Sequence, residues 1–200
     1  MSRYSPARLA LLVGGCVVLG LGVGLLLTAD LGSDGYSTLV NGISRTTGID
    51  FFVVNLAVSA VFLAVAATRR LFPDVGTVVQ VVVVGFTVSV TIDLLEIPDP
   101  LAGRSAYLVV AFPVLAVGIA AYLGSNLGAG PAEAAALAWD PPVPFRWSYS
   151  VVQGGGAVLG WLLGAAIGPG TLAVVLLLGP AVDLAARTMR VNVTQGRATH

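Results

Sequence analysis

Lysine is absent from this chain, and cysteine and histidine occur once each, at Cys16 and His200. A single cysteine excludes a disulfide framework within the chain and any zinc site built from several cysteines. A histidine at the last position of the sequence leaves none within the apolar segments for catalysis. The nucleophile elbow of hydrolases, the paired histidines of metalloproteases and the phosphate-binding loop of nucleotidases are also missing. We therefore expect no enzyme activity, no catalytic residues, no metal and no cofactor.

Charged residues are also few in this sequence. Only 10% of the 200 residues are charged, 56% are hydrophobic, and the mean hydropathy is +0.93. A soluble globular domain carries about 25% charged residues, and a disordered chain has low hydrophobicity with high net charge. The basic and acidic residues balance at ten each, so no basic surface for nucleic acid is expected. The composition predicts one integral membrane domain over residues 1–200, with the lipid bilayer as its partner.

Six apolar runs are long enough to be read as membrane spans, which need about 20 mostly apolar residues. The predicted spans are residues 9–29, 51–68, 75–97, 106–124, 147–167 and 171–187. The valine runs do not alternate with polar residues, as the strands of a membrane barrel would. The fold class expected is therefore all-α and polytopic. The first run exceeds the usual core of a signal peptide, so we expect a retained helix.

The arginines set the expected orientation, because cytoplasmic loops are enriched in basic residues. If the chain begins in the cytoplasm, Arg45 and Arg104 lie outside. The other arginines then lie on the cytoplasmic side: Arg3, Arg8, Arg69, Arg70, Arg146, Arg187, Arg190 and Arg197. This bias predicts that both termini are cytoplasmic, with a tail over residues 188–200.

The second half of the chain repeats elements of the first. The matching elements are Gly22 with Gly118, Asp30-Leu31-Gly32 with Asn126-Leu127-Gly128, and Gly76-Thr77 with Gly170-Thr171. The two repeats cover residues 8–97 and 105–187, and each also holds a segment too short to span, at 36–47 and 132–140. Three spans in each repeat place the repeats in opposite orientations, an inverted arrangement common in secondary transporters. The short segments are either broken, re-entrant helices or interfacial turns.

A family resemblance rests on these same motifs. The motifs are Leu31-Gly32-Ser33-Asp34-Gly35, Leu127-Gly128-Ala129-Gly130-Pro131, Gly168-Pro169-Gly170-Thr171 and Gly179-Pro180-Ala181-Val182-Asp183. They resemble the YczE-type family of bacterial multi-pass membrane proteins, which is related to the YitT group, over about residues 8–187. The resemblance implies a location in the bacterial cytoplasmic (inner) membrane.

The leading functional hypothesis is a small secondary permease or channel-like facilitator. Helix N-termini that meet between inverted repeats bind anionic groups in transporters, so an anionic or zwitterionic small solute is expected. The predicted substrate-binding residues are Asp30, Gly32, Asp34, Gly76, Thr77, Asn126, Gly128, Gly130, Pro131, Gln153, Gly170 and Thr171. The alternative is a non-transporting subunit or regulator of another membrane complex.

Other intramembrane residues have two readings each. Asp93 and Asp183 are candidate gating residues, since charge within a membrane is costly, although Asp183 could instead pair with Arg187. Asn55, Gln80 and Gln153 either join helices by hydrogen bonds or line a polar path. Glycines at helical spacing predict close helix contacts, within the chain or in a homodimer. They are Gly20 with Gly24, and Gly156 with Gly160, Gly164 and Gly168.

Overall fold

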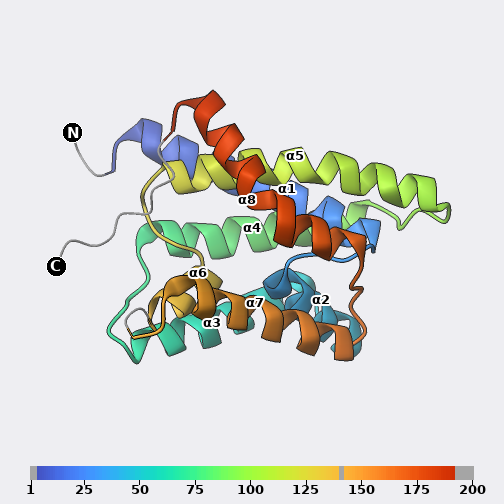
Figure 1. Cartoon of the computed structure of the whole chain (residues 1–200), viewed down its shortest axis with the longest axis horizontal. Coiled ribbons are helices and arrows are strands. Elements are labelled where there is room, and N and C mark those ends of the chain that lie inside the picture. Colours follow the sequence, from blue (N-terminus) through green and yellow to red (C-terminus); the bar gives the residue numbers. More distant parts are fainter. Residues whose placement is uncertain (1–3, 140–141, 192–200) are drawn as a thin grey trace.

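The computed structural model describes residues 4–139 and 142–191, which form eight helices and no strand. The helices are α1 (Pro6–Ala29), α2 (Gly35–Thr47), α3 (Phe51–Ala67), α4 (Val75–Leu94), α5 (Leu101–Gly124), α6 (Pro131–Leu137), α7 (Phe145–Leu162) and α8 (Pro169–Met189) (Figure 1). The predicted all-α class is confirmed for the described residues.

The helices lie in two layers, and each half of the chain contributes two helices to each layer (Figure 1). In one layer α1 packs on α5, with α4 against α1 and α8 against α5. In the other layer α2 packs on α7 and α3 on α6. The contact of α1 with α4 in the first half therefore corresponds to that of α5 with α8 in the second. Each layer contains helices from both halves of the chain.

Two glycines at matching positions bring the backbones of α1 and α5 together. A Cβ atom on Gly22 would lie 2.9 Å from the backbone nitrogen of Leu115, and one on Gly118 would lie 2.4 Å from the backbone nitrogen of Leu19. Side chains larger than hydrogen would force these helices apart. The α1–α5 contact therefore depends on both glycines.

The remaining glycine pairs pack within the chain where they meet another helix. Gly20 and Gly24 lie against Thr87 and Thr91 of α4. Gly156 and Gly160 of α7 lie against the backbone of α2, but Gly164 meets nothing within 4 Å. The expected four-glycine face is thus wrong beyond Gly160, because α7 ends at Leu162.

Within residues 4–139 and 142–191, four helices are long and apolar enough to cross a membrane: α1, α4, α5 and α8. α3 is apolar but has only 17 residues, and α7 is not among the helices that are both long and apolar enough to span. Large apolar side chains are exposed on the outer faces, such as Phe86 at 58% and Leu176 at 67%. These apolar faces indicate insertion into a membrane.

Several predicted boundaries move by a few residues. α5 begins at Leu101 rather than 106, and α4 ends at Leu94 rather than 97. α7 ends at Leu162 rather than 167, since Gly164 adopts a left-handed φ of 86° that stops the helix. The short segments expected at 36–47 and 132–140 form α2 and α6, although residue 140 lies outside the described residues.

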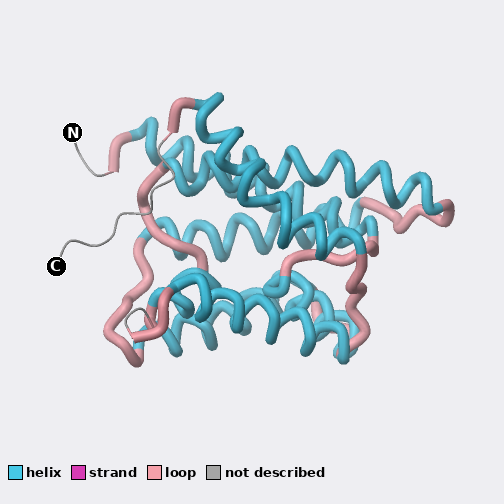
Figure 2. The backbone as a smooth tube through the Cα atoms, viewed as in Figure 1, coloured by secondary structure: helices cyan, strands magenta, loops and turns pink. Residues whose placement is uncertain are grey.

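Both short helices begin inside the molecule. The loops after α1 and α5 turn back from the two ends toward the middle, where α2 and α6 start (Figure 2). Asp34 caps α2 by accepting a hydrogen bond from the Ser37 backbone N–H at 3.0 Å, whereas Pro131 provides the first turn of α6. This geometry places polar residues between the two layers.

Candidate functional site

The first Leu-Gly turn closes onto the start of α8. The backbone N–H of Gly170 donates to the carbonyl oxygen of Leu31 at 2.8 Å. A Cβ on Gly32, which has a φ of 98°, would lie 2.4 Å from Oγ1 of Thr171. This N-terminal N–H of α8 is therefore occupied by a backbone carbonyl from the other half of the chain.

The second Leu-Gly turn makes the corresponding contact at the start of α4. The backbone N–H of Gly76 donates to the carbonyl of Leu127 at 2.9 Å, and the hydroxyl of Thr77 donates to the carbonyl of Ala129 at 2.7 Å. A Cβ on Gly128 would lie 2.9 Å from Oγ1 of Thr77. The four predicted turns thus meet as two pairs at opposite ends of the layer (Figure 1), and not in one place.

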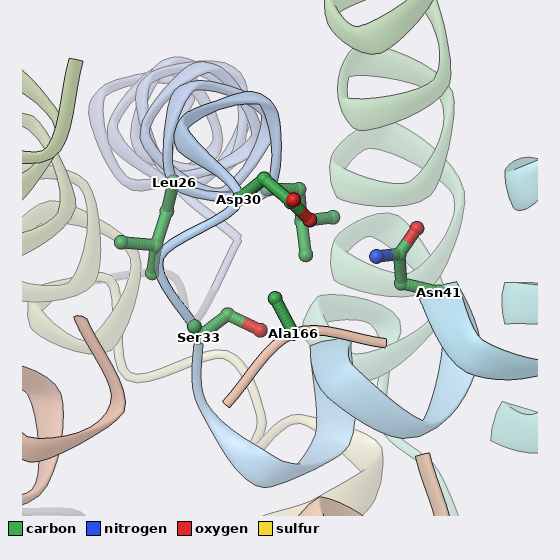
Figure 3. Close-up of a pocket in the computed structure, with 7 residues that line it drawn as sticks. Leu26, Asp30, Ser33, Asn41 and Ala166 are labelled. Atoms are coloured by element: carbon green, nitrogen blue, oxygen red, sulfur yellow. The ribbon is translucent and has the colours of Figure 1, made fainter. Parts of the chain in front are cut away.

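Asp30 is held by arginines. It ends α1 with a left-handed φ of 51°, and its carboxylate lies 3.0 Å from Arg45 and 2.8 Å from Arg104. A cavity of about 10 Å³ beside it, lined also by Ser33 and Asn41, has room for roughly one water molecule (Figure 3). Its symmetry mate Asn126 is exposed, with a φ of 55°. Both residues therefore terminate helices.

The polar residues inside the molecule converge on α7. Tyr149 and Gln153 are four residues apart and so share one face of this helix. Oε1 of Gln153 accepts a hydrogen bond from the Tyr36 backbone N–H at 3.0 Å, and its Nε2 lies 2.7 Å from the Tyr149 hydroxyl. Tyr149 in turn forms a side-chain hydrogen bond with Glu133. Two side chains of α7, Gln153 and Tyr149, thus connect the starts of α2 and α6.

A second branch of hydrogen bonds runs from Tyr36 to α3 and α4. The Tyr36 hydroxyl lies 2.9 Å from Oδ1 of Asn55 and 2.7 Å from Oγ of Ser59. Nδ2 of Asn55 donates to the carbonyl of Val81 at 2.9 Å. Because Asn55 and Ser59 are buried, these bonds offset the cost of placing polar groups in the interior.

Gly130 and Gln80 complete the surroundings of Glu133. The backbone N–H of Gly130 donates to the Tyr122 hydroxyl at 2.9 Å. A Cβ on Gly130 would lie 2.6 Å from Oε2 of Glu133 and 3.3 Å from Nε2 of Gln80, so both side chains lie against this glycine. Oε1 of Gln80 is buried and has no hydrogen-bond partner.

We define the interior polar cluster as six of the residues in these contacts together with Asp34, whose charge acts on Glu133. They are Asp34, Tyr36, Gln80, Gly130, Glu133, Tyr149 and Gln153. Burial raises the pKa of Glu133, and the charge of Asp34 raises it further. Burial also raises the pKa of Asp34, although hydrogen bonds from the start of α2 oppose this rise. No ion pair within the described part of the chain involves either carboxyl group.

The predicted site residues divide between these places. Asp34, Gly130 and Gln153 contribute to the interior polar cluster, and Pro131 begins the helix that carries Glu133. Asp93 and Asp183, the predicted gating residues, are exposed on α4 and α8.

Sequence reasoning missed three members of the cluster. They are Tyr36, Glu133 and Tyr149. One signal was visible for the acid, because Glu133 is the only charge among the apolar residues of α6. The spacing of Tyr149 and Gln153 on an apolar helix was a second signal.

Comparison with known proteins identifies a family whose function is unknown. A family model described as a family of unknown function, DUF6198, matches residues 6–187. An uncharacterized protein of Haemophilus influenzae is 28% identical over 170 residues, covering 83% of this chain and 77% of the relative. No solved structure matches. Because the family model covers nearly the whole described chain, this protein belongs to the DUF6198 family of unknown function.

Proposed function

We propose that this protein is a small secondary permease whose solute passes through the interior polar cluster. The observation that carries the proposal is the pair of carboxyl side chains, Asp34 and Glu133, near the starts of the two short helices. Both lie between helices whose outer faces are apolar. Ionisable groups inside a membrane protein are costly and commonly mark a solute or ion path.

The arrangement of the halves supports this role. We propose that α3 and α7 cross the membrane together with the four longer helices, which gives six spans in two inverted repeats. The matching helix pairs and the reciprocal contacts of Gly32 with Thr171 and Gly128 with Thr77 support this symmetry. Transporters with such symmetry place their solute between the repeats, where helices are broken. α2 and α6 are the broken helices of this proposal.

The proposed setting is the bacterial inner membrane, with the loop between α3 and α4, which holds Arg69 and Arg70, on the cytoplasmic side. The positive-inside rule supports this orientation. The resemblance of its Leu-Gly and Gly-Thr motifs to those of the YczE-type family is the basis for proposing a common origin with that family.

Reconstitution tests the function directly. Purified protein in liposomes should carry at least one solute from a panel of amines, amino acids, carboxylates and polyols. Glu133→Gln should reduce that flux at least tenfold, while Glu96→Gln, an exposed acid near the end of α4, should leave it unchanged. Absence of flux for the whole panel, together with a membrane protein that co-purifies in fixed ratio, would instead favour a non-transporting subunit.

A further inference from the structure

The hydrogen bonds of the interior polar cluster have one direction. The Tyr36 backbone N–H can only donate, so Oε1 of Gln153 is the acceptor and its Nε2 must donate to the Tyr149 hydroxyl. The proton of Tyr149 is then available for Glu133, with which it forms a hydrogen bond. Each donor in this series of three hydrogen bonds therefore points toward Glu133, which is the last acceptor of the series.

The Gln80 side chain, which lies against Gly130 together with Glu133, offers a second acceptor. Oε1 of Gln80 is buried without a partner, while its Nε2 lies beside Gly130, which Glu133 also touches. An unpaired buried acceptor destabilises the folded state, so a ligand that donates a hydrogen bond here is favoured. A carboxylate and an amide oxygen together call for a group with at least two donors.

Among the side chains that the structure describes, no arginine forms an ion pair with Asp34 or Glu133, and Arg69 stacks on Trp139. Lysine is absent from the sequence, and the arginines Arg45 and Arg104 are committed to Asp30. Two carboxyl groups that share an interior cannot both ionise without a balancing positive charge. The balance must come either from a proton or from a cation that enters.

We propose that the interior polar cluster binds a small monovalent organic cation with a primary ammonium group, in exchange for one proton held on Glu133. The inference rests on the permease function proposed above. The O–H bond of Glu133 breaks, its proton passes to water, and the ammonium N–H groups donate to the Glu133 carboxylate and to Oε1 of Gln80. One positive charge leaves as one enters, so the charge of the interior is unchanged. The cluster thus favours a cationic solute over the anionic one expected from helix N-termini.

The titratable groups that face Glu133 are acids and phenols, which is consistent with this exchange. Asp34 and Tyr36 face it from α2, Tyr149 from α7 and Tyr122 from α5. α3, which also packs on α6, contributes only the uncharged Asn55 and Ser59 to this network. The raised pKa of Glu133 lets it hold a proton above the usual carboxyl range.

Proton release on binding tests the exchange. Methylammonium added to purified protein in weakly buffered detergent solution should release about one proton for each cation bound, measured by a pH indicator dye and by calorimetry in parallel. Glu133→Gln should bind no methylammonium and release no proton. Gln80→Leu should weaken binding about tenfold, the equivalent of one hydrogen bond. Tetramethylammonium, which has no N–H donor, should also bind at least tenfold more weakly.

Controls separate the inference from folding and from the function itself. Glu96→Gln should behave as the unaltered protein, and Glu133→Asp should restore proton release if Glu133→Gln proves unstable. Binding without proton release, or no binding of any ammonium probe, overturns the exchange. Flux of an anion or polyol alone would overturn the exchange but leave a permease. Absence of all flux would overturn the permease as well.

Discussion

The guanidinium of Arg104, at the start of α5, lies 2.8 Å from Oδ2 of Asp30, at the end of α1. Its Nε also donates to the backbone carbonyl of Ala29 at 2.9 Å, and its Nη2 to the backbone carbonyl of Asp30. Arg104 therefore satisfies carbonyls that the end of α1 leaves without helical partners. Arg45 approaches the same carboxylate from α2 and is more exposed.

Replacement of Arg104 should cost more stability than replacement of Arg45. Arg104→Leu removes one ion pair and the donors to two backbone carbonyls, which we expect to cost about 2–3 kcal/mol. Arg45→Leu removes an exposed pair and an exposed, longer hydrogen bond to the carbonyl of Gly164 at 3.3 Å, and should cost less than about 1 kcal/mol. Thermal unfolding in detergent measures both. Equal losses would show that the backbone contacts of Arg104 contribute little.

Two glycines of α7 should respond in opposite ways to alanine. A Cβ on Gly160 would lie 2.2 Å from the carbonyl oxygen of Thr38, so Gly160→Ala must push α2 away, at a cost of about 1–3 kcal/mol. Gly155 meets nothing within 4 Å, and Gly155→Ala should leave the melting temperature unchanged or slightly higher. A melting temperature that is unchanged in Gly160→Ala would contradict the close packing of α2 on α7.

The stability of the protein should depend on pH through Glu133. Its folded-state pKa is raised above the ordinary value of 4.5, so the folded state binds more protons than the unfolded state between those two values. Stability from this group is then present at low pH and is lost as pH rises through the folded pKa. Glu133→Gln stays neutral, so its melting temperature should exceed that of the unaltered protein by an amount that grows with pH. Each 1 kcal/mol corresponds to roughly 2–4 °C for a chain of this size.

The exposed control for this comparison is Glu96→Gln. Its difference from the unaltered protein should stay constant over the same range of pH. A Glu133→Gln difference that is equally constant would mean that Glu133 does not carry a raised pKa.

Thiol labelling should establish the orientation. Cys16 is fully buried, so an impermeant maleimide should not react with the unaltered protein. The variant Asp99→Cys, in the exposed loop between α4 and α5, should react with the maleimide in intact cells. The variant Phe72→Cys, in the exposed loop between α3 and α4, should react only after the membrane is permeabilised. The opposite pattern would reverse the proposed orientation.

The helices could be predicted from the sequence because each rests on local information. Apolar runs of sufficient length mark the long helices, and the Leu-Gly turns mark the starts of α2 and α6. The sequence predicts too late an end for α7, because residues 163–167 are as apolar as the helix before them. Only the left-handed backbone at Gly164 distinguishes this segment.

The site could be predicted only in part, because its geometry depends on contacts between distant segments. The Leu-Gly and Gly-Thr motifs were expected to meet at one place, since symmetry alone does not say whether matching turns share a centre. The structure pairs Leu31 with Gly170 and Leu127 with Gly76, at separate ends. The contact of Tyr36 with Gln153 joins residues more than 100 positions apart, beyond the reach of any local pattern.

The mixing of both halves in each layer has a consequence for how the protein is made. While α1 to α4 alone have left the ribosome, α1 lacks α5, and α2 lacks α7. Glu133 and Gln153 have not yet been synthesised at that stage. Asp34 therefore inserts with the first half of the chain, before the other members of the interior polar cluster from the second half exist. The interior polar cluster is therefore assembled late in biosynthesis, and two separately expressed halves should form it only when they associate.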